Sequence, residues 1–157
     1  MVKSHISYFF IFCILSLILM GCSGDVLLDK EEKVNESAWT YQDTLVYEFT
    51  VEDTTKSVDF MLDVKYKTDF GYENLYTEVT TIFPNGDNTK ETLSFELRSA
   101  EALDQTKCSG SDCIVPILML ENANFSQKGK HTIKINQYSR VDSLRGVESL
   151  RLSILRR

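Results

Sequence analysis

The chain has 157 residues, 43% of them hydrophobic, and a formal net charge of −6 at pH 7. This length is sufficient for one domain with a single hydrophobic core. An acidic surface is repelled by nucleic-acid phosphates and by anionic lipid headgroups. The composition therefore argues against nucleic acid as a partner and against a basic patch that binds membranes.

The first residues have the pattern of an export signal. Lys3 precedes an uncharged apolar run from Ile6 to Met20, which is shorter than the roughly 20 residues that a membrane-spanning helix needs. The junction Leu19-Met20-Gly21-Cys22 resembles a bacterial lipobox. We therefore predict a lipoprotein signal peptide at residues 1–21 and lipidation of Cys22. The alternatives are an uncleaved anchor and an ordinary secretory signal.

Covalent lipid on Cys22 is the predicted attachment to a membrane. Each buried methylene contributes about 0.8 kcal/mol, so the two or three acyl chains of a lipoprotein cysteine suffice for stable anchoring. Ser23 follows the cysteine directly, and the nearest acidic residue is Asp25. We interpret this as attachment to the outer membrane with the domain facing the periplasm.

The residues that follow the lipidated cysteine read as a tether. Residues 22–38 are mostly polar and show no sustained hydrophobic period, as is typical of a linker. The apolar patch Val26-Leu27-Leu28 leaves open that this part docks on the domain or adds an edge strand. The domain itself is expected to cover residues 39–157.

From Trp39 onward, apolar and polar residues alternate with the period of two that is typical of half-buried strands. Turn signals such as Asn85-Gly86 separate the runs. About seven strands are expected, at residues 39–52, 58–67, 75–84, 92–98, 114–120, 129–138 and 149–155. With no convincing amphipathic helix, the pattern predicts an all-β fold, an antiparallel β-sandwich of Ig-like or jelly-roll style. Residues 140–147 fit a helical turn or a loop equally well.

Two cysteines remain in the domain once Cys13 is removed with the signal and Cys22 carries lipid. Cys108 and Cys113 are separated by four residues that include a glycine, and an exported protein folds where disulfides persist. We therefore predict a disulfide between them. A zinc site is the alternative, but His131 is the only histidine after the signal, so no Cys₂His₂ set can form.

No residue pattern points to catalysis, a metal or a cofactor. His131 lies in an expected strand, and no Gly-x-Ser-x-Gly motif accompanies it. The carboxylates that could pair for glycoside hydrolysis lie on expected solvent-facing or mixed strand faces: Asp59, Asp63, Glu78 and Glu96. The segment 85–88 has oxygen ligands suited to calcium, but a turn uses the same residues. We therefore expect a protein without enzymatic activity.

The aromatic residues separate into a core group and an exposed group. Four of them share inward-facing positions of the expected strands: Trp39, Tyr41, Tyr47 and Tyr66. Tyr72 and Tyr76 lie near a loop and are the aromatic residues most expected to be exposed. Together with Asn74 they are the predicted contacts for a ligand or a partner, and a row of exposed aromatics would suit sugar stacking.

Several sequence blocks stand in a distinctive order and spacing. They are the lipobox cysteine, Ser37-Ala38-Trp39, Asp53-Thr54-Thr55, the segment 69–75, Phe83-Pro84-Asn85-Gly86, Glu91-Thr92-Leu93 and the segment 144–152. Together these blocks resemble the gliding-motility lipoprotein GldH family. The resemblance implies a lipoprotein with an accessory, non-catalytic role in gliding machinery. Its partners would be envelope proteins of a motility or secretion assembly. Residues 99–113 depart from the usual family pattern and contain the cysteine pair. A lipid-anchored glycan-binding module is the alternative function.

Overall fold

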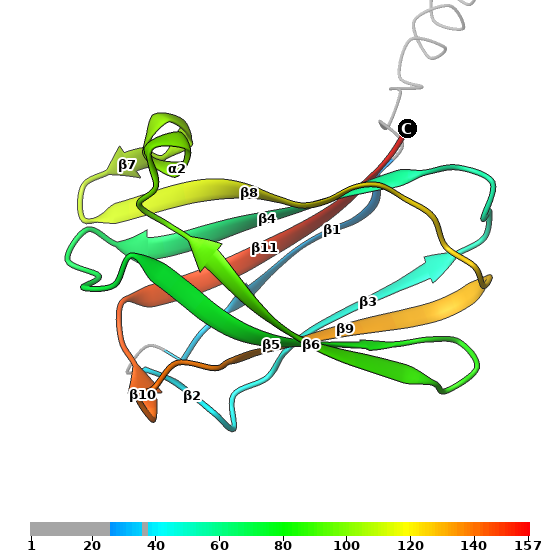
Figure 1. Ribbon diagram of the computed structural model, residues 1–157, viewed down its shortest axis with the longest axis horizontal. Coiled ribbons are helices and arrows are strands. Elements are labelled where there is room, and N and C mark those ends of the chain that lie inside the picture. Colours follow the sequence, from blue (N-terminus) through cyan, green and yellow to red (C-terminus); the bar gives the residue numbers. More distant parts are fainter. Residues whose placement is uncertain (1–25, 36–37) are drawn as a thin grey trace, which may run out of the picture.

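The computed structural model describes residues 26–35 and 38–157 as two β-sheets packed face to face (Figure 1). The five-stranded sheet has the order β1 (Val26–Lys33), β11 (Val147–Arg156), β4 (Val58–Lys67), β8 (Asp112–Ala123), β7 (Lys107–Ser109). The four-stranded sheet has the order β3 (Leu45–Val51), β9 (Gly129–Gln137), β5 (Asn74–Ile82), β6 (Asn88–Glu96). All strand pairs are antiparallel. The predicted all-β sandwich is therefore confirmed.

The described residues form eleven strands in three sheets, where the sequence predicted about seven strands. The seven long predicted runs correspond to β3, β4, β5, β6, β8, β9 and β11. The additional strands are β1, the short β7, and the pair β2 (Trp39–Thr40) and β10 (Ser143–Leu144), which forms the two-stranded sheet. Strands of two or three residues are too short to show a period of two, so the sequence pattern misses them.

Strand β1 lies in a segment that the sequence favoured as a tether. Its backbone pairs with β11 from Val26↔Leu155 to Lys33↔Ser149, and Leu27 and Leu28 pack against the core. The β-sandwich therefore includes residues 26–35, as the edge-strand alternative for the apolar patch allowed. The tether prediction failed here because β1 is an edge strand with charged side chains, which hide the alternation.

The one regular helix in the described part of the chain, α2 (Ala100–Gln105), was not predicted. Ser99 caps its N-terminus, since the Ala102 amide donates to the Ser99 hydroxyl over 3.2 Å. Six residues are too few to show a helical period. The helix joins β6 of one sheet to β7 of the other. Residues 140–147 are mostly a loop, which was one of the two expected alternatives, and the two-residue strand β10 lies within it.

Side chains from both sheets alternate into one core between them. In β4, five alternating residues are buried as predicted: Val58, Phe60, Leu62, Val64 and Tyr66. Tyr41 contradicts its predicted inward position, because a turn at residues 41–44 separates β2 from β3 and leaves the ring exposed. The Asp43 carboxylate stabilises this turn by accepting from the Thr40 amide over 2.9 Å.

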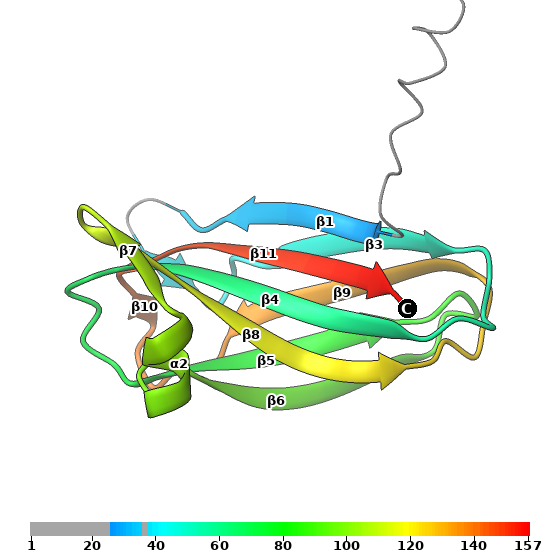
Figure 2. The same cartoon turned by 90° about the horizontal axis from the view of Figure 1, so that it is seen from above.

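The sandwich has two different long sides (Figure 2). On one side β1 lies next to β3, and on the other β8 lies over β6. The connection from β6 to β7 passes from one sheet to the other on the second side, and its helix α2 lies beside β7 and β8. Beyond α2, this second side has no further covering element in the described part of the chain, and this arrangement positions the candidate sites below.

Candidate functional site

The predicted lipidation site, Cys22, lies outside the described residues. The described domain begins at Val26, whose strand partner is Leu155, two residues before the C-terminus. Both chain ends of the domain therefore lie at the same end of the sandwich. No helix within residues 26–35 and 38–157 is both long and apolar enough to cross a membrane.

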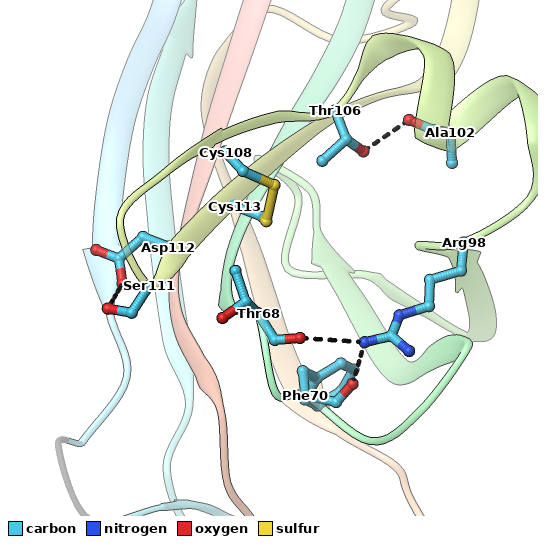
Figure 3. Close-up of a disulfide and its surroundings, with 9 residues drawn as sticks. All are labelled: Thr68, Phe70, Arg98, Ala102, Thr106, Cys108, Ser111, Asp112 and Cys113. Carbon is cyan, nitrogen blue, oxygen red and sulfur yellow. Dashed lines mark hydrogen bonds between the residues drawn. A yellow bond between two sulfur atoms is a disulfide. The ribbon is translucent and has the colours of Figure 1, made fainter.

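The two remaining cysteines form the predicted disulfide (Figure 3). Cys108 and Cys113 are directly opposite each other in the β7–β8 hairpin, with their Cα atoms 4.0 Å apart. The hairpin turns at Gly110, whose φ of +63° matches a turn that requires glycine at its first central position. The disulfide closes a hairpin at one end of the sheet, and neither cysteine lines the cavity between β8 and β6.

The predicted contact residues lie at the start of β5 and in the loop before it. The Tyr72 ring packs against Phe70 at 5.4 Å between centroids, and the Asn74 amide donates to the Ser94 hydroxyl over 3.0 Å. Tyr72 and Tyr76 are exposed, as the sequence predicted. Asn74 and Tyr76 share the outer face of the four-stranded sheet, since they are two residues apart in β5.

Sequence reasoning missed the second tyrosine of this outer face. The Tyr138 amide donates to the Tyr76 carbonyl over 2.8 Å, so Tyr138, directly after β9, lies opposite Tyr76 of the neighbouring strand β5. Tyr76 is 47% exposed and Tyr138 55%. The hydroxyl of the exposed Tyr41 donates to the Ser139 carbonyl over 2.5 Å, which brings a third tyrosine near this pair. These residues form the tyrosine cluster: Tyr41, Tyr76 and Tyr138.

An exposed apolar row lies on the outer face of the five-stranded sheet along β8. Ile114 and Leu118 pair with Lys65 and Met61 of β4, and Leu118 is 50% exposed. Strand β7 pairs with β8 only at residues 112–114. Residues 115–123 therefore have no strand partner on that edge within the described chain, and such an edge can accept another strand.

A cavity of about 310 Å³ opens between the sheets on the side of β8 and β6. Its wall is mostly apolar, with Phe60, Leu93 and Phe125 among its residues. His131 also lies in this wall, stacked on Phe49 at 5.5 Å between ring centroids, and its Nδ1 is 3.1 Å from the Gly129 carbonyl oxygen. His131 is 2% exposed. The histidine therefore lies in the expected strand and packs among aromatic rings.

A network of charged side chains joins three strands at the opposite end of the five-stranded sheet. Lys65 contacts Asp112 at 3.0 Å and Glu148 at 2.9 Å, and Lys67 contacts Asp112 at 2.7 Å and also pairs with Glu148. Hydrogen bonds from Lys67 and Lys65 lower the pKa of the Asp112 and Glu148 carboxyls. The same bonds raise the pKa of the Lys67 amine. Each charge is matched, so the network links β4, β8 and β11.

Two of the four carboxylates considered for catalysis contact basic side chains. Asp59 accepts from Arg157 Nε over 2.6 Å, and Glu78 contacts Lys90 at 2.8 Å. Burial raises the pKa of the Asp63 carboxyl. Within the described residues, no three His, Cys, Asp or Glu side chains gather as a metal site requires. The segment 85–88 contains a turn in which the Asp87 amide donates to the Asn85 side chain over 3.1 Å.

Solved structures with a similar arrangement of strands are distant. A family GH115 4-O-methyl-α-glucuronidase matches 86% of this chain and 18% of its own, with 13% identity and a TM-score of 0.44. A family 35 carbohydrate-binding module from an environmental isolate matches 87% of this chain and 94% of its own, with 12% identity and a TM-score of 0.34.

Sequence comparison gives closer relatives. A gliding motility lipoprotein GldH homolog of Christiangramia forsetii is 25% identical over 146 residues, which are 90% of this chain and 88% of that protein. The gliding motility lipoprotein GldH of Flavobacterium johnsoniae is 22% identical over 136 residues, 86% of this chain and 84% of that protein. Residues 26–154 also match the family described as GldH lipoprotein. The chain therefore belongs to the GldH lipoprotein family.

Proposed function

We propose that this lipoprotein is a non-enzymatic accessory component of the bacterial gliding-motility and envelope machinery, and that it acts through protein contacts. Two relatives that align with most of the chain are named for gliding motility. The observation that carries the proposal is the apolar row on β8, where Ile114 and Leu118 are exposed beside an unpaired strand edge. Exposed apolar patches next to open edges are typical of partner-binding surfaces.

The partner that this surface suits is an envelope protein that offers an apolar strand. An added strand would pair with the backbone of residues 115–123 and would contact Leu118 with its side chains. Pro116 has no amide hydrogen to donate, which is common on edge strands and limits indiscriminate pairing. Helix α2, which contacts β8, also has an exposed apolar side chain, Leu103.

The test combines genetics with recovery of the partner. Deletion of the gene should reduce colony spreading, and the wild-type gene should restore it. Leu118→Asp should fail to restore spreading and should lose the envelope proteins that co-purify with the wild type from detergent-solubilised membranes. Leu155→Asp is the matched control, because Leu155 is exposed on the outer face of the same sheet but on β11. Full restoration by Leu118→Asp, or normal spreading after deletion, would contradict the proposal.

We further propose attachment to the outer membrane with the domain facing the periplasm. The support comes from the residues after Cys22, where Ser23 follows directly. Protease treatment of intact cells should leave the domain uncut, whereas the same treatment after permeabilisation should degrade it. Cleavage in intact cells would instead indicate a domain on the cell surface.

A lipid-anchored glycan-binding module is the second candidate, and the tyrosine cluster favours it. Tyr76 and Tyr138 are neighbouring exposed rings on an outer sheet face, and aromatic faces are suited to packing against the apolar faces of sugars. Tyr76→Ala and Tyr138→Ala should each reduce retardation by envelope polysaccharide in affinity electrophoresis. Leu155→Ala is the control, since Leu155 is exposed on the outer face of the other sheet, away from the tyrosine cluster. Retardation that is unchanged in both variants, or absent from the wild type, rules this function out.

A further inference from the structure

The cavity between β8 and β6 has the size and lining of a binding site for an apolar ligand. Its volume of about 310 Å³ is roughly twice that of a ~150 Å³ apolar cavity known to bind benzene. Ligand pockets in proteins start at about 300 Å³ and are mostly apolar with a few polar groups. Here the aromatic residues Phe49, Phe60, Phe83 and Phe125 belong to the wall.

Local strand geometry keeps this cavity open. A β-bulge in β8 shifts the register between Leu118, which pairs with Met61, and Leu120, which pairs with Phe60. Since Phe60 points into the core, Leu120 turns toward the same side and joins the cavity wall. Leu120 is nevertheless 55% exposed, so it forms an apolar rim. Bulges often redirect side chains next to functional sites.

The opposite rim is formed by β6, whose inward-facing positions become more exposed toward the mouth. Phe95 is buried, Leu93 is half-buried, and Glu91 and Thr89 are exposed. All four alternate on the same face of the strand. The mouth thus combines an apolar interior with polar groups at its edge, which suits a ligand with a long apolar body and a polar end.

The position of the cavity relates it to the lipid-bearing end of the chain. Val58 pairs with Ala123 in the cavity wall, and Val26 begins β1 at the same end of the sheet. The order β1-β11-β4-β8 separates Val26 from Ala123 by three strand spacings, about 14 Å at ~4.8 Å each. The four residue steps from Cys22 to Val26 can span up to roughly 14 Å. An acyl chain attached to Cys22 can therefore reach the mouth, as can one from the surrounding membrane.

From these observations we propose that the cavity binds one linear acyl chain. A methylene is similar in size to a water molecule, so with ~30 Å³ for each the space accommodates about ten methylenes. The chain enters between Leu120 and Leu93, and its apolar body lies between the two sheets. Its source is either the lipid on Cys22 or a free or membrane lipid, which present the same chemistry to the wall.

Photo-crosslinking in cells tests the proposal with the complete protein. Cells that are fed a fatty acid with a diazirine in its chain are irradiated, and adducts on the purified protein are mapped by mass spectrometry. Adducts are expected on cavity residues such as Met119 and Phe125. A cross-link to the peptide that contains Cys22 identifies the protein's own lipid as the source. An adduct with the mass of a free fatty acid or a phospholipid identifies the other source.

A filled-cavity variant gives the matched comparison. Leu93→Trp places a larger side chain in the cavity, so this variant should lose most of the cavity adducts. Leu103→Trp, at an exposed position of α2, should keep them. Both variants are compared at equal amounts in the membrane, so that misfolded protein is not counted. The proposal is overturned if the wild type has adducts only on outer residues, or if its cavity adducts persist unchanged in a folded Leu93→Trp protein.

Discussion

The two long sides of the sandwich differ in how completely they are closed. On the side of β1 and β3, the buried Tyr47 hydroxyl donates to the Leu150 carbonyl over 2.8 Å, which joins the two sheets. The Lys30 amine, on β1, donates to the Val46 carbonyl of β3 over 2.9 Å. This side is thus held by hydrogen bonds between opposite sheets as well as by apolar packing.

Among the described residues, no hydrogen bond joins β8 to β6 along the cavity. The inward face of β6 is 6% exposed at Phe95 but open to solvent at Glu91 and Thr89. The two sides of this small domain therefore differ in how they are held together. We expect the closed side to contribute more to stability, whereas the open side has the apolar rim, the cavity and the unpaired strand edge on which the proposed binding depends.

The largest expected contrast is between two leucine-to-alanine substitutions. Leu150→Ala removes a fully buried side chain on the closed side and should lower the free energy of unfolding by about 3 kcal/mol. Leu93→Ala on the open side should cost less than about 1 kcal/mol, because that side chain already borders a cavity. Urea unfolding of both variants measures the contrast. Equal losses would mean that the open side is packed as tightly as the closed side.

The disulfide should have the next largest effect. Replacement of Cys108 and Cys113 by serine removes a cross-link over a short loop, and the chain-entropy relation gives a loss of about 2 kcal/mol. The change should leave photo-crosslinking of the cavity intact, because neither cysteine belongs to its wall. Thermal melts with and without reductant measure the first effect. A serine variant as stable as the oxidised wild type would show that the hairpin holds without the bond.

Tyr47→Phe tests the hydrogen bond that joins the sheets on the closed side. It should cost about 1 kcal/mol near neutral pH, since the Leu150 carbonyl loses a buried donor. Burial raises the pKa of the Tyr47 hydroxyl, so the unfolded chain ionises first above pH ~10 and wild-type stability then falls. Because Tyr47→Phe lacks this ionisable hydroxyl, its stability should fall less than that of the wild type as the pH rises above ~10. Tyr138→Phe, at an exposed ring, is the control and should change stability little.

The long strands could be predicted because each shows a strong two-residue period. The prediction for β4 matched in bounds and in buried residues, since one face is apolar and the other charged along the full strand. Strand β1 was left only as an alternative to a tether, because Lys30 and Glu32 occupy the positions opposite the buried Leu152 and Leu150, where apolar residues would show the alternation. The ion pair of Asp29 with Arg151 of β11 stabilises β1 through a residue 122 positions away. No local pattern contains that information.

The candidate sites were only partly predictable for the same physical reason. The exposure of Tyr72 and Tyr76 followed from their place near a loop, but Tyr138 became part of the tyrosine cluster only through its pairing with Tyr76. The cavity depends on the β8 bulge and on the separation of two sheets, which no single segment determines. The family resemblance identified the lipoprotein family without locating either surface.

The smallest expected effect concerns the charged network that ties β8 of the open side to β11, next to β1. Glu148→Gln should lower the melting temperature slightly at pH 7 in low salt, because exposed ion pairs contribute little. Lys67 and Lys65 lower the pKa of the Glu148 and Asp112 carboxyls, so their contribution is present above the unfolded-state value of about 4. It is lost as pH falls below that value through the depressed folded-state pKa.

The difference between the wild type and Glu148→Gln should therefore shrink below pH ~4, and also in high salt, which screens the pairs. Glu91→Gln, which alters an exposed carboxylate on β6, is the control and should show no such pH dependence attributable to this network. Thermal melts at several pH values give the measurement. A difference that is the same at pH 3 and pH 7 would mean that Glu148 contributes by packing rather than by charge, and that β8 is joined to the closed side through the backbone ladder alone.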